Sequence, residues 1–325
     1  MSTAASRVLR VGTRASALAL WQTERVRALL AERGYATERV EITTTGDVIQ
    51  DIPLAAVGGV AFFTRQLDET MLAGHIDLAV HSLKDLPTVL PPGIRLAAVS
   101  SREDPRDALV GRHPLLWRDV PPRAIIATSS LRRRAQLKRA RPDLTVVDIR
   151  GNVDTRLARL DASPEWAATV LATAGLVRLG FAARIGERMP LDVMLPAPGQ
   201  GALAVTARAD DALVLAAARE AVHDEGTAVA VTAERALLRR LEGGCSVPIG
   251  ALAEVRQAAK GWLLRLRGNA VSVDGTRAAD VDAEGVVDDG DDATAFGEAA
   301  AETLLARGAD RILHDLKTQR AAPWS

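Results

Sequence analysis

Basic and hydroxyl-bearing side chains gather in four short stretches, each at the end of an apolar run that is typical of a β-strand. The stretches are GTRAS (12–16), HSLKDLP (81–87), ATSSLRRRAQ (127–136) and RGNVDTR (150–156). Where a strand runs into a helix, the free backbone N–H groups of the helix attract anions. Arginine binds carboxylates or phosphates through two parallel hydrogen bonds. The spacing therefore favours a site for a ligand with several acidic groups.

The first two stretches each allow a functional and a structural interpretation. Arg14 and Ser16 could bind an anion together with a helix N-terminus, or Ser16 could simply cap that helix. In HSLKDLP, which also contains Ser82, the carboxylate of Asp85 could stabilise a cation or transfer protons. The alternative is a surface ion pair between Asp85 and Lys84, which contributes less than about 1 kcal/mol. Spacing leaves these alternatives open.

The next two stretches are rich in arginine. Thr128 and Ser130 offer hydroxyl groups at the end of a strand, and two arginines follow within one helical turn, Arg132 and Arg133. A solvated basic helix or a nucleic-acid-binding patch is the alternative, but no aromatic residues are interleaved and the sequence pI is near 7. Three more arginines lie near further strand ends: Arg150, Arg156 and Arg178. Several arginines in one cleft would indicate a substrate with several carboxylates or phosphates.

The only cysteine of the chain lies in a glycine-rich stretch, LEGGCSVPIG (241–250). A single cysteine is most often a small buried apolar residue. Cys245 follows two glycines and precedes a proline, so a nucleophile and an attachment point are the alternatives. Spacing does not decide among the three. Five histidines without ligand spacing predict no zinc site, and no glycine pattern for nucleotide binding occurs.

Length and composition indicate a soluble protein of several domains. With 325 residues the chain exceeds the usual size of one hydrophobic core, and 48% hydrophobic with 25% charged residues is ordinary for a globular protein. The net charge is zero, yet residues 121–160 contain ten Lys/Arg and three Asp, a net charge of +7 that suggests an anionic partner. No apolar run approaches a membrane helix and no signal peptide is evident, so we expect a cytoplasmic protein.

The elements that must position these residues alternate between strand and helix. Over the first 220 residues, short apolar runs alternate with helical patterns, which predicts an α/β fold with largely parallel sheets. Breaks at 100–108 and 195–202 suggest two chain crossings between two lobes, with the ligand in a hinged cleft. From about residue 222 the pattern predicts a small α+β domain. The predicted domains are residues 1–101 with 199–221, residues 102–198, and residues 222–325.

Seven stretches together resemble the porphobilinogen deaminase family. They are GTRASALALWQ, AVHSLKDLP, REDPRDALV, TSSLRRRAQ, RGNVDTRL, PAPGQGAL and LEGGCSVPIG, in that family's order between residues 12 and 250. The resemblance implies three domains, of which the first two resemble the lobes of periplasmic solute-binding proteins. It also implies a transferase of porphyrin (heme) biosynthesis that condenses four porphobilinogen molecules head to tail, with release of ammonia, to give hydroxymethylbilane.

The same resemblance implies a role for each candidate residue. Cys245 would carry a dipyrromethane cofactor through a thioether, and Asp85 would be the catalytic carboxylate. The residues that would contact the cofactor are Ser82, Lys84, Thr128, Ser130, Arg132 and Arg133. Those that would contact the substrate are Arg14, Ser16, Arg150, Arg156 and Arg178. No metal is implied.

The resemblance extends to partners. We expect a cytoplasmic monomer that binds porphobilinogen, neither nucleic acid nor membrane, and passes its product to uroporphyrinogen-III synthase. The main alternative is a non-catalytic two-lobe solute-binding protein for a polycarboxylate ligand. That class needs no cysteine and usually has an export signal, whereas this chain has the loop cysteine and no evident signal.

Two positions depart from the family's pattern. Many members have a lysine in a GGKG stretch where this chain reads VGGVAFF (57–63), with Val60 in the lysine's place. Any role of that lysine is therefore left open for this chain. Ala127 also replaces the glycine that is common before TSS, which is a small change at a strand end.

Overall fold

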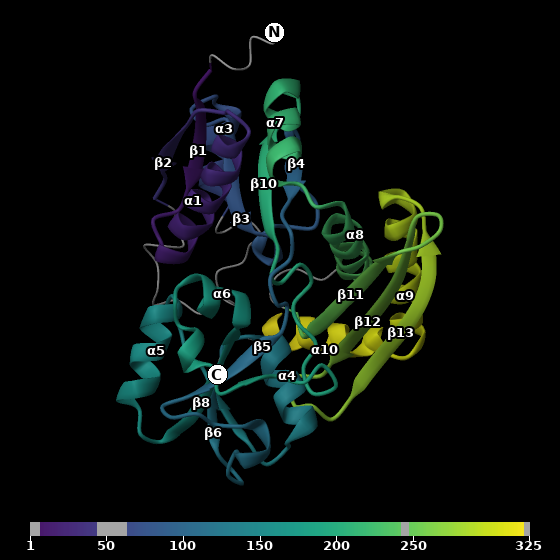
Figure 1. Ribbon diagram of the computed structural model, residues 1–325. Helices are drawn as coiled ribbons and strands as arrows, with labels where there is room; N and C mark the ends of the chain where they lie inside the picture. Colours follow the sequence, from purple (N-terminus) through teal and green to yellow (C-terminus); the bar gives the residue numbers. More distant parts are fainter. Residues whose placement is uncertain (1–6, 44–63, 242–246, 322–325) are drawn as a thin grey trace. The chain divides into compact units, whose positions relative to one another are not determined.

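A computed structural model describes residues 7–43, 64–241 and 247–321 of the chain. Contacts divide the chain into two compact units (Figure 1). Unit 1 comprises residues 1–103 and 201–228, and unit 2 comprises residues 104–200 and 229–325. Each unit has its own sheet or sheets and its own hydrophobic core.

Unit 1 is built on a five-stranded sheet in the order β2-β1-β3-β10-β4. The strands are β1 (Leu9–Thr13), β2 (Thr37–Glu41), β3 (Leu78–Ser82), β4 (Ile94–Val99) and β10 (Leu203–Arg208). Strand β1 runs parallel to β2 and β3, whereas β10 runs antiparallel to β3 and β4. Because β1 and β3 are parallel neighbours, their carboxyl ends lie at the same edge of the sheet.

The described residues of unit 1 add the α-helices α1 (Ala17–Glu32), α3 (Arg65–Leu72) and α7 (Ala212–Val222) and the short 3₁₀ helix η2 (Leu83–Asp85). Helix α1 begins after Ser16, whose side chain accepts a hydrogen bond from the backbone of Ala19, and ends before Gly34, which has a φ of +82°. Its buried residues Val26 and Leu30 share one core with β-strand residues such as Leu78 and Val205.

The first sheet of unit 2 has the order β7-β6-β8-β5-β9. Its strands are β5 (Asp107–Gly111), β6 (Ile125–Ala127), β7 (Thr145–Val147), β8 (Trp166–Ala172) and β9 (Glu187–Arg188). The α-helices around it are α4 (Leu131–Ala140), α5 (Val153–Ala162) and α6 (Thr173–Arg178), with short 3₁₀ helices at Trp117–Asp119 and Ala182–Arg184. Strand β6 is parallel to β7 and β8, so the carboxyl ends of these three strands share one edge.

Unit 2 also contains a small antiparallel sheet, β11-β12-β13. Its strands are β11 (Ile249–Gln257), β12 (Trp262–Val271) and β13 (Ala278–Val287), and the helices are α8 (Glu225–Arg240), which leads into it, α9 (Gly290–Ala306) and α10 (Ala309–Ala321). Leu237, Leu264, Leu266 and Leu304 belong to one buried cluster. Helix α9 packs against β12 and β13 (Figure 1). This is the small third sheet that the change of pattern near residue 222 predicts.

The predicted α/β class is confirmed, with two mixed sheets and a third, smaller one. The sheets are less parallel than expected, because β10 and β5 run against their neighbours. Strand β5 begins at Asp107, inside a stretch that the sequence marks as a polar break. The boundaries of three separate domains stay a prediction, since residues 104–200 and 229–325 group into one compact unit.

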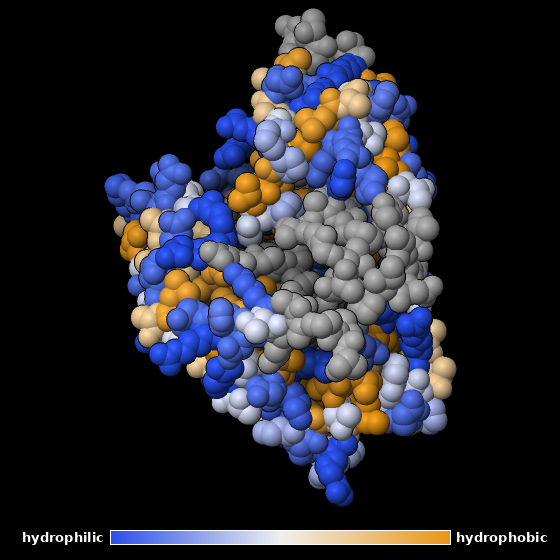
Figure 2. Space-filling view, turned by 180° about the vertical axis from the view of Figure 1, so that it is seen from behind, coloured by the Kyte–Doolittle hydropathy of each residue, from blue (hydrophilic) through white to orange (hydrophobic). Residues whose placement is uncertain are grey.

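Large apolar side chains that remain exposed in the described residues lie on separate elements. They are Val8, Trp21, Leu72, Val89, Leu96, Leu213 and Val286. On the face drawn in Figure 2, hydrophobic residues are interspersed with hydrophilic ones. Singly exposed apolar residues of this kind are normal on a folded protein and by themselves indicate no partner.

Candidate active site

In unit 1, five predicted site residues follow two neighbouring parallel strands. They are Arg14 and Ser16 after β1, and Ser82, Lys84 and Asp85 at the end of β3 and in the turn that follows. Gly12 of β1 lies opposite Ala79 of β3 in the parallel register. The structure therefore brings the two stretches, which lie far apart in sequence, to one sheet edge, where ligands of α/β proteins commonly bind.

Ser82 is held by a residue that the sequence analysis did not single out. Gln22 of α1 is 2% exposed, and its Nε2 donates a hydrogen bond to Ser82 Oγ at 2.8 Å. The bond fixes the serine hydroxyl from the side of the helix. Gln22 is the last residue of the GTRASALALWQ stretch. The sequence signal for its role was a polar residue at a helix position that is otherwise buried.

Asp85 lies in a 3₁₀ turn whose backbone is anchored in unit 1. Leu83 is fully buried, its backbone N–H donates to Ala202 O at 3.0 Å, and Leu86 N donates back to Leu83 O at 3.1 Å. Asp85 itself is exposed, and Lys84 is half-buried. The turn thus presents the carboxylate of Asp85 at the sheet edge on a fixed backbone.

The histidine of the same stretch is not suited to carry protons at neutral pH. His81 is buried, and its Nε2 lies 3.2 Å from Thr206 Oγ1 on the neighbouring strand β10. Burial, together with the positive charge of Arg14, lowers the pKa of His81 to about 4. The imidazole therefore stays neutral at neutral pH and serves the packing of β3 against β10. That leaves Asp85 as the exposed carboxylate of the HSLKDLP stretch.

In unit 2, the remaining predicted residues follow the three parallel strands of the first sheet. Thr128 and Ser130 follow β6, Arg150 follows β7, and Arg178 ends α6, the helix that begins directly after β8. Arg156 lies in α5, and its Nε donates to Gly151 O at 2.7 Å. Gly151 has a φ of +104°, which a glycine adopts readily. The turn beside Arg150 and the side chain of Arg156 are thereby joined.

The hydroxyl groups after β6 bind backbone groups at this edge. Ser130 caps α4, with its Oγ 3.5 Å from the backbone nitrogen of Arg133. Thr128 Oγ1 accepts from Ser130 N at 3.3 Å. Ser129 Oγ donates to Ile149 O at 2.8 Å and accepts from Ile149 N at 3.0 Å, which ties the end of β6 to the segment after β7. Arg150, the next residue, is positioned by that link.

Arg132 and Arg133 are buried, each 5% exposed, and share one carboxylate, Asp107. Arg132 Nη1 donates to Asp107 Oδ2 at 2.6 Å, and Arg133 donates to Asp107 Oδ1 from Nε at 3.1 Å and from Nη2 at 2.8 Å. Each arginine also donates to a backbone oxygen, that of Leu195 or Val170. Contact of the two arginines with a cofactor stays a prediction. Their side chains would make that contact from positions that the hydrogen bonds to Asp107 and to the backbone already fix.

Asp107 is the buried acid that this pair of arginines requires. Burial by itself raises the pKa of Asp107, but the charges of Arg132 and Arg133, with hydrogen bonds from Arg132 and Gln200, outweigh burial and hold this pKa well below its ordinary value. Asp107 was missed because it opens a short strand inside the polar stretch REDPRDALV. An acid directly before an apolar run, in a chain rich in arginine, was the available sequence signal.

Cys245 and Val60 lie outside the described residues. Ala127 is fully buried as the last residue of β6, and its carbonyl oxygen accepts from Thr169 Oγ1 at 2.8 Å. Among the residues that the structure describes, no three histidine, cysteine, aspartate or glutamate side chains come together to hold a metal ion. No helix in the same residues is long and apolar enough to cross a membrane.

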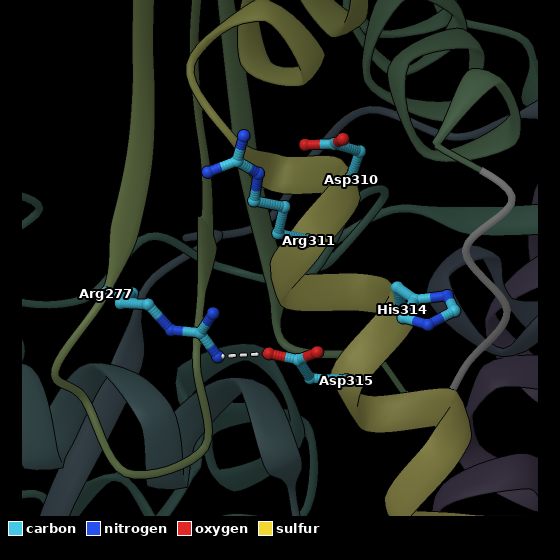
Figure 3. A pocket seen from close by; sticks show the side chains of 5 residues that line it. All are labelled: Arg277, Asp310, Arg311, His314 and Asp315. Atoms are coloured by element: carbon cyan, nitrogen blue, oxygen red, sulfur yellow. Dashed lines mark hydrogen bonds and ion pairs between the residues drawn. The ribbon is translucent and has the colours of Figure 1, made fainter.

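A hollow of about 540 Å³ lies beside α10, and none of the predicted site residues lines it. Figure 3 shows its lining side chains, Arg277, Asp310, Arg311, His314 and Asp315. Arg277 Nη2 donates to Asp315 Oδ2 at 2.6 Å, so its charge is balanced by an ion pair. Acids and bases alternate in this hollow, which is not the chemistry of a polycarboxylate site.

Two family models match the chain over most of its length. Residues 9–216 match the model described as "Porphobilinogen deaminase, dipyromethane cofactor binding domain", and residues 228–306 match "Porphobilinogen deaminase, C-terminal domain". The chain belongs to the porphobilinogen deaminase family. It is 47% identical over 320 residues to the porphobilinogen deaminase of Geobacter metallireducens, covering 98% of both chains. It is 49% identical over 316 residues to that of Syntrophotalea carbinolica, covering 95% of this chain and 96% of the relative.

A solved structure with a lower similarity is a nutrient-binding protein from Burkholderia cenocepacia bound to methionine. The TM-score is 0.41 at 15% identity, over 66% of this chain and 92% of that chain. A similarity at this level says nothing about what the present chain binds.

Membership of the porphobilinogen deaminase family confirms the predicted activity. The chain is a transferase of porphyrin biosynthesis that condenses four porphobilinogen molecules, with release of ammonia, into hydroxymethylbilane. Its residues 9–216 match the part of the family that binds a dipyrromethane cofactor. The alternative of a non-catalytic solute-binding protein is not supported.

Proposed function

We propose that this enzyme builds its product on a dipyrromethane attached through a thioether to Cys245, with Asp85 as the catalytic carboxylate. The main support is the edge of the unit 1 sheet, where the exposed Asp85 follows β3 beside the end of β1 with Arg14 and Ser16. The buried His81 of the same stretch does not compete for this role, because its pKa is about 4.

The thioether proposal is supported by the chain's sulfur chemistry. A thioether to a protein side chain forms from a thiol, and Cys245 is the only cysteine among the 325 residues. It lies within residues 228–306, which match the C-terminal domain of the family. The flanking glycines of LEGGCSVPIG would leave room for a tethered group.

The donor groups of the described residues fit a ligand of this chemistry. Each pyrrole ring of the cofactor and of the growing chain carries two carboxylates, which arginines and hydroxyl groups bind well. We propose that the cofactor is contacted by Ser82, Lys84, Thr128, Ser130, Arg132 and Arg133. We propose that the substrate is contacted by Arg14, Ser16, Arg150, Arg156 and Arg178.

The reaction assigns a clear task to Asp85. Loss of ammonia from the aminomethyl group of porphobilinogen breaks a C–N bond and leaves an electron-poor cation on the substrate. The carboxylate of Asp85 stabilises this positive charge and accepts a hydrogen bond from a pyrrole N–H. When bound, the dipyrromethane supplies the pyrrole carbon that forms the first new C–C bond. Formation of this bond would release a proton from the attacking carbon, and we propose that Asp85 accepts it.

Intact-mass spectrometry combined with kinetics tests this proposal. The purified protein should be heavier than its sequence by a dipyrrole adduct, and the Cys245→Ala protein should lack the adduct. Asp85→Asn should fold and keep the adduct yet turn over porphobilinogen at least about 100-fold more slowly, the usual scale for loss of a catalytic acid or base. An unmodified mass in active wild-type protein would overturn the attachment, and near-normal turnover of Asp85→Asn would remove Asp85 from the mechanism.

The domain boundaries and partners are part of the same proposal. We propose three domains with the boundaries predicted above, in a cytoplasmic monomer that passes its product to uroporphyrinogen-III synthase. The scattered exposed apolar residues of the described chain support a monomer. Light scattering during size-exclusion chromatography should give a mass near 34.5 kDa, and a mass twice as large would refute the monomer.

A further inference from the structure

A buried chain of amide hydrogen bonds in unit 2 leads from Arg132 to the start of strand β11. Its centre is the backbone of Leu195. Leu195 N donates to Gln136 Oε1 at 2.8 Å, and Leu195 O accepts from Gln136 Nε2 at 3.0 Å and from Arg132 Nη1 at 2.8 Å. Gln136, on α4, is 2% exposed. A single side-chain amide thus satisfies both backbone groups of Leu195.

The chain of hydrogen bonds continues through Asn269 of β12, which is 5% exposed. Asn269 Nδ2 donates to Gln136 Oε1 at 3.0 Å, and Asn269 Oδ1 accepts from Gly250 N at 3.1 Å. Gly250 lies opposite Asn269 in the pairing of β11 with β12. It is five residues beyond Cys245 in the sequence.

The two backbone N–H groups determine how both amides are oriented. Leu195 N and Gly250 N can only donate, so the oxygen atoms of Gln136 and Asn269 must face them. In that orientation the nitrogen of Asn269 faces the oxygen of Gln136, which is the complementary pairing that the structure contains. Every hydrogen bond in this chain, which we call the amide bridge, therefore pairs a donor with an acceptor.

Close packing leaves little freedom for the position of β11 at this point. A Cβ added to Gly250 would lie 2.8 Å from Leu195 Cβ and 3.0 Å from Leu195 O. The next residue, Ala251, donates its N–H to Pro196 O at 3.0 Å. The beginning of β11 is thus held directly against the segment 195–196.

We propose that Gln136 and Asn269 are positioning residues for the covalently held cofactor. They fix the position of Gly250, at the end of the stretch that contains Cys245, relative to Arg132. The inference rests on the proposed attachment at Cys245. A covalently attached cofactor reacts fast only when its point of attachment is held in place, and a misplacement of about 1 Å can slow a reaction about 100-fold. Because both groups are neutral amides, their contribution does not depend on pH between about 6 and 9.

Kinetics of the holoenzyme variants Asn269→Ala and Asn269→Ser test the proposal. We expect kcat for porphobilinogen to fall about tenfold at every pH between about 6 and 9, with KM changed less than about twofold, because the arginines remain. Hydrogen exchange of the Gly250 and Ala251 amides should be faster in both variants. Asn269→Ser keeps a short polar group and serves if the alanine variant does not fold.

A matched control lies just beyond the same strand. Ser272 is 7% exposed, and its Oγ donates to Asp274 Oδ1 at 2.5 Å and accepts from Arg277 N at 2.9 Å, away from the amide bridge. Ser272→Ala should lower Tm but keep kcat within about twofold, as loss of buried hydrogen bonds alone would. Normal kcat in both Asn269 variants that carry the cofactor would overturn the inference and leave the attachment intact. A wild-type protein without the adduct would instead overturn the proposed function.

Discussion

Replacing Asp107 by asparagine should destabilise the protein strongly, because two buried arginines depend on this carboxylate. Asp107 is fully buried; its Oδ1 accepts from Arg133 and Gln200, and its Oδ2 accepts from Arg132. Asparagine has nearly the same shape but no charge, and it presents an NH₂ group where an oxygen had accepted hydrogen bonds. Both guanidinium groups would lose their shared counterion at a buried site.

The expected size of the effect follows from the burial of the pair. Removing one partner of a buried ion pair destabilises a protein by about 3–5 kcal/mol. Unit 2 has about 200 residues, and for a protein of that size Tm changes by about 2–4 °C per kcal/mol, so Tm should fall by about 10 °C. The control is the ion pair of Asp148 with Arg134, which lies on the same helix as Arg132 and Arg133, since the Asp148 side chain is 72% exposed. Asp148→Asn should change stability by less than about 1 kcal/mol.

The dependence on pH gives a second measurement of the same carboxylate. The pKa of Asp107 in the folded protein lies below its ordinary value, because the two arginines outweigh the effect of burial. Such a group stabilises the fold above its unfolded-state pKa of about 4, and the stabilisation is lost as pH falls further. As the pH is lowered below about 4, the Tm of the wild-type protein should therefore decrease. The part of this decrease that is due to Asp107 should be absent in Asp107→Asn.

Calorimetry of wild type, Asp107→Asn and Asp148→Asn between about pH 3 and 8 provides the assay. Circular dichroism at about 20 °C shows whether each variant is folded before it is heated. If Asp107→Asn melted within about 2 °C of Asp148→Asn at neutral pH, the carboxylate would not be what holds the two arginines, and the reasoning would be refuted.

Three further predictions test other parts of the structure. Gln22→Ala should lower kcat/KM for porphobilinogen several-fold while stability falls by only about 1 kcal/mol, because Ser82 loses its buried donor; unchanged kinetics would exclude this positioning role. The folded-state pKa of His81 is about 4, so protonation favours the unfolded chain and Tm should fall as pH drops from about 6.5 to 4; His81→Asn should flatten that slope, and an unchanged slope would show that another group causes it. Gly275→Ala should destabilise more than Gly180→Ala, because both have a φ of +78° but only at Gly275 would a Cβ meet backbone, 2.3 Å from Arg139 N; equal losses of Tm would contradict this.

The location of the candidate site residues at strand ends could be predicted from the sequence, because it depends on residues that are near one another in the chain. The GTRAS and HSLKDLP stretches each follow an apolar run, and the structure has strands β1 and β3 ending there. The same holds for TSSLRRRAQ after β6 and RGNVDTR after β7. A strand end followed by a helix is decided by residues near one another in sequence, and so are the arginines and hydroxyl groups placed there.

The partners of these residues could not be predicted in the same way. Gln22 bonds to Ser82 across 60 positions, and Asp107 bonds to Arg132 across 25. Residues 100–108 have the composition of a polar break, whereas Asp107 begins the buried strand β5. A polar run ending in a charged residue resembles a loop unless the arginines that neutralise it are known to lie beside the same strand.

By itself, the sequence determined the family, the α/β class, and the placement of arginine and hydroxyl side chains at the strand ends, because these follow from motifs and short-range patterns. Only the tertiary structure decided that His81 is buried and neutral, that Asp107 holds Arg132 and Arg133, and that Asn269 meets Gln136 from 133 positions away. Burial and pairing depend on which strands become neighbours, and that order is set by packing of the whole chain. Such contacts have no local signal in the residues that make them.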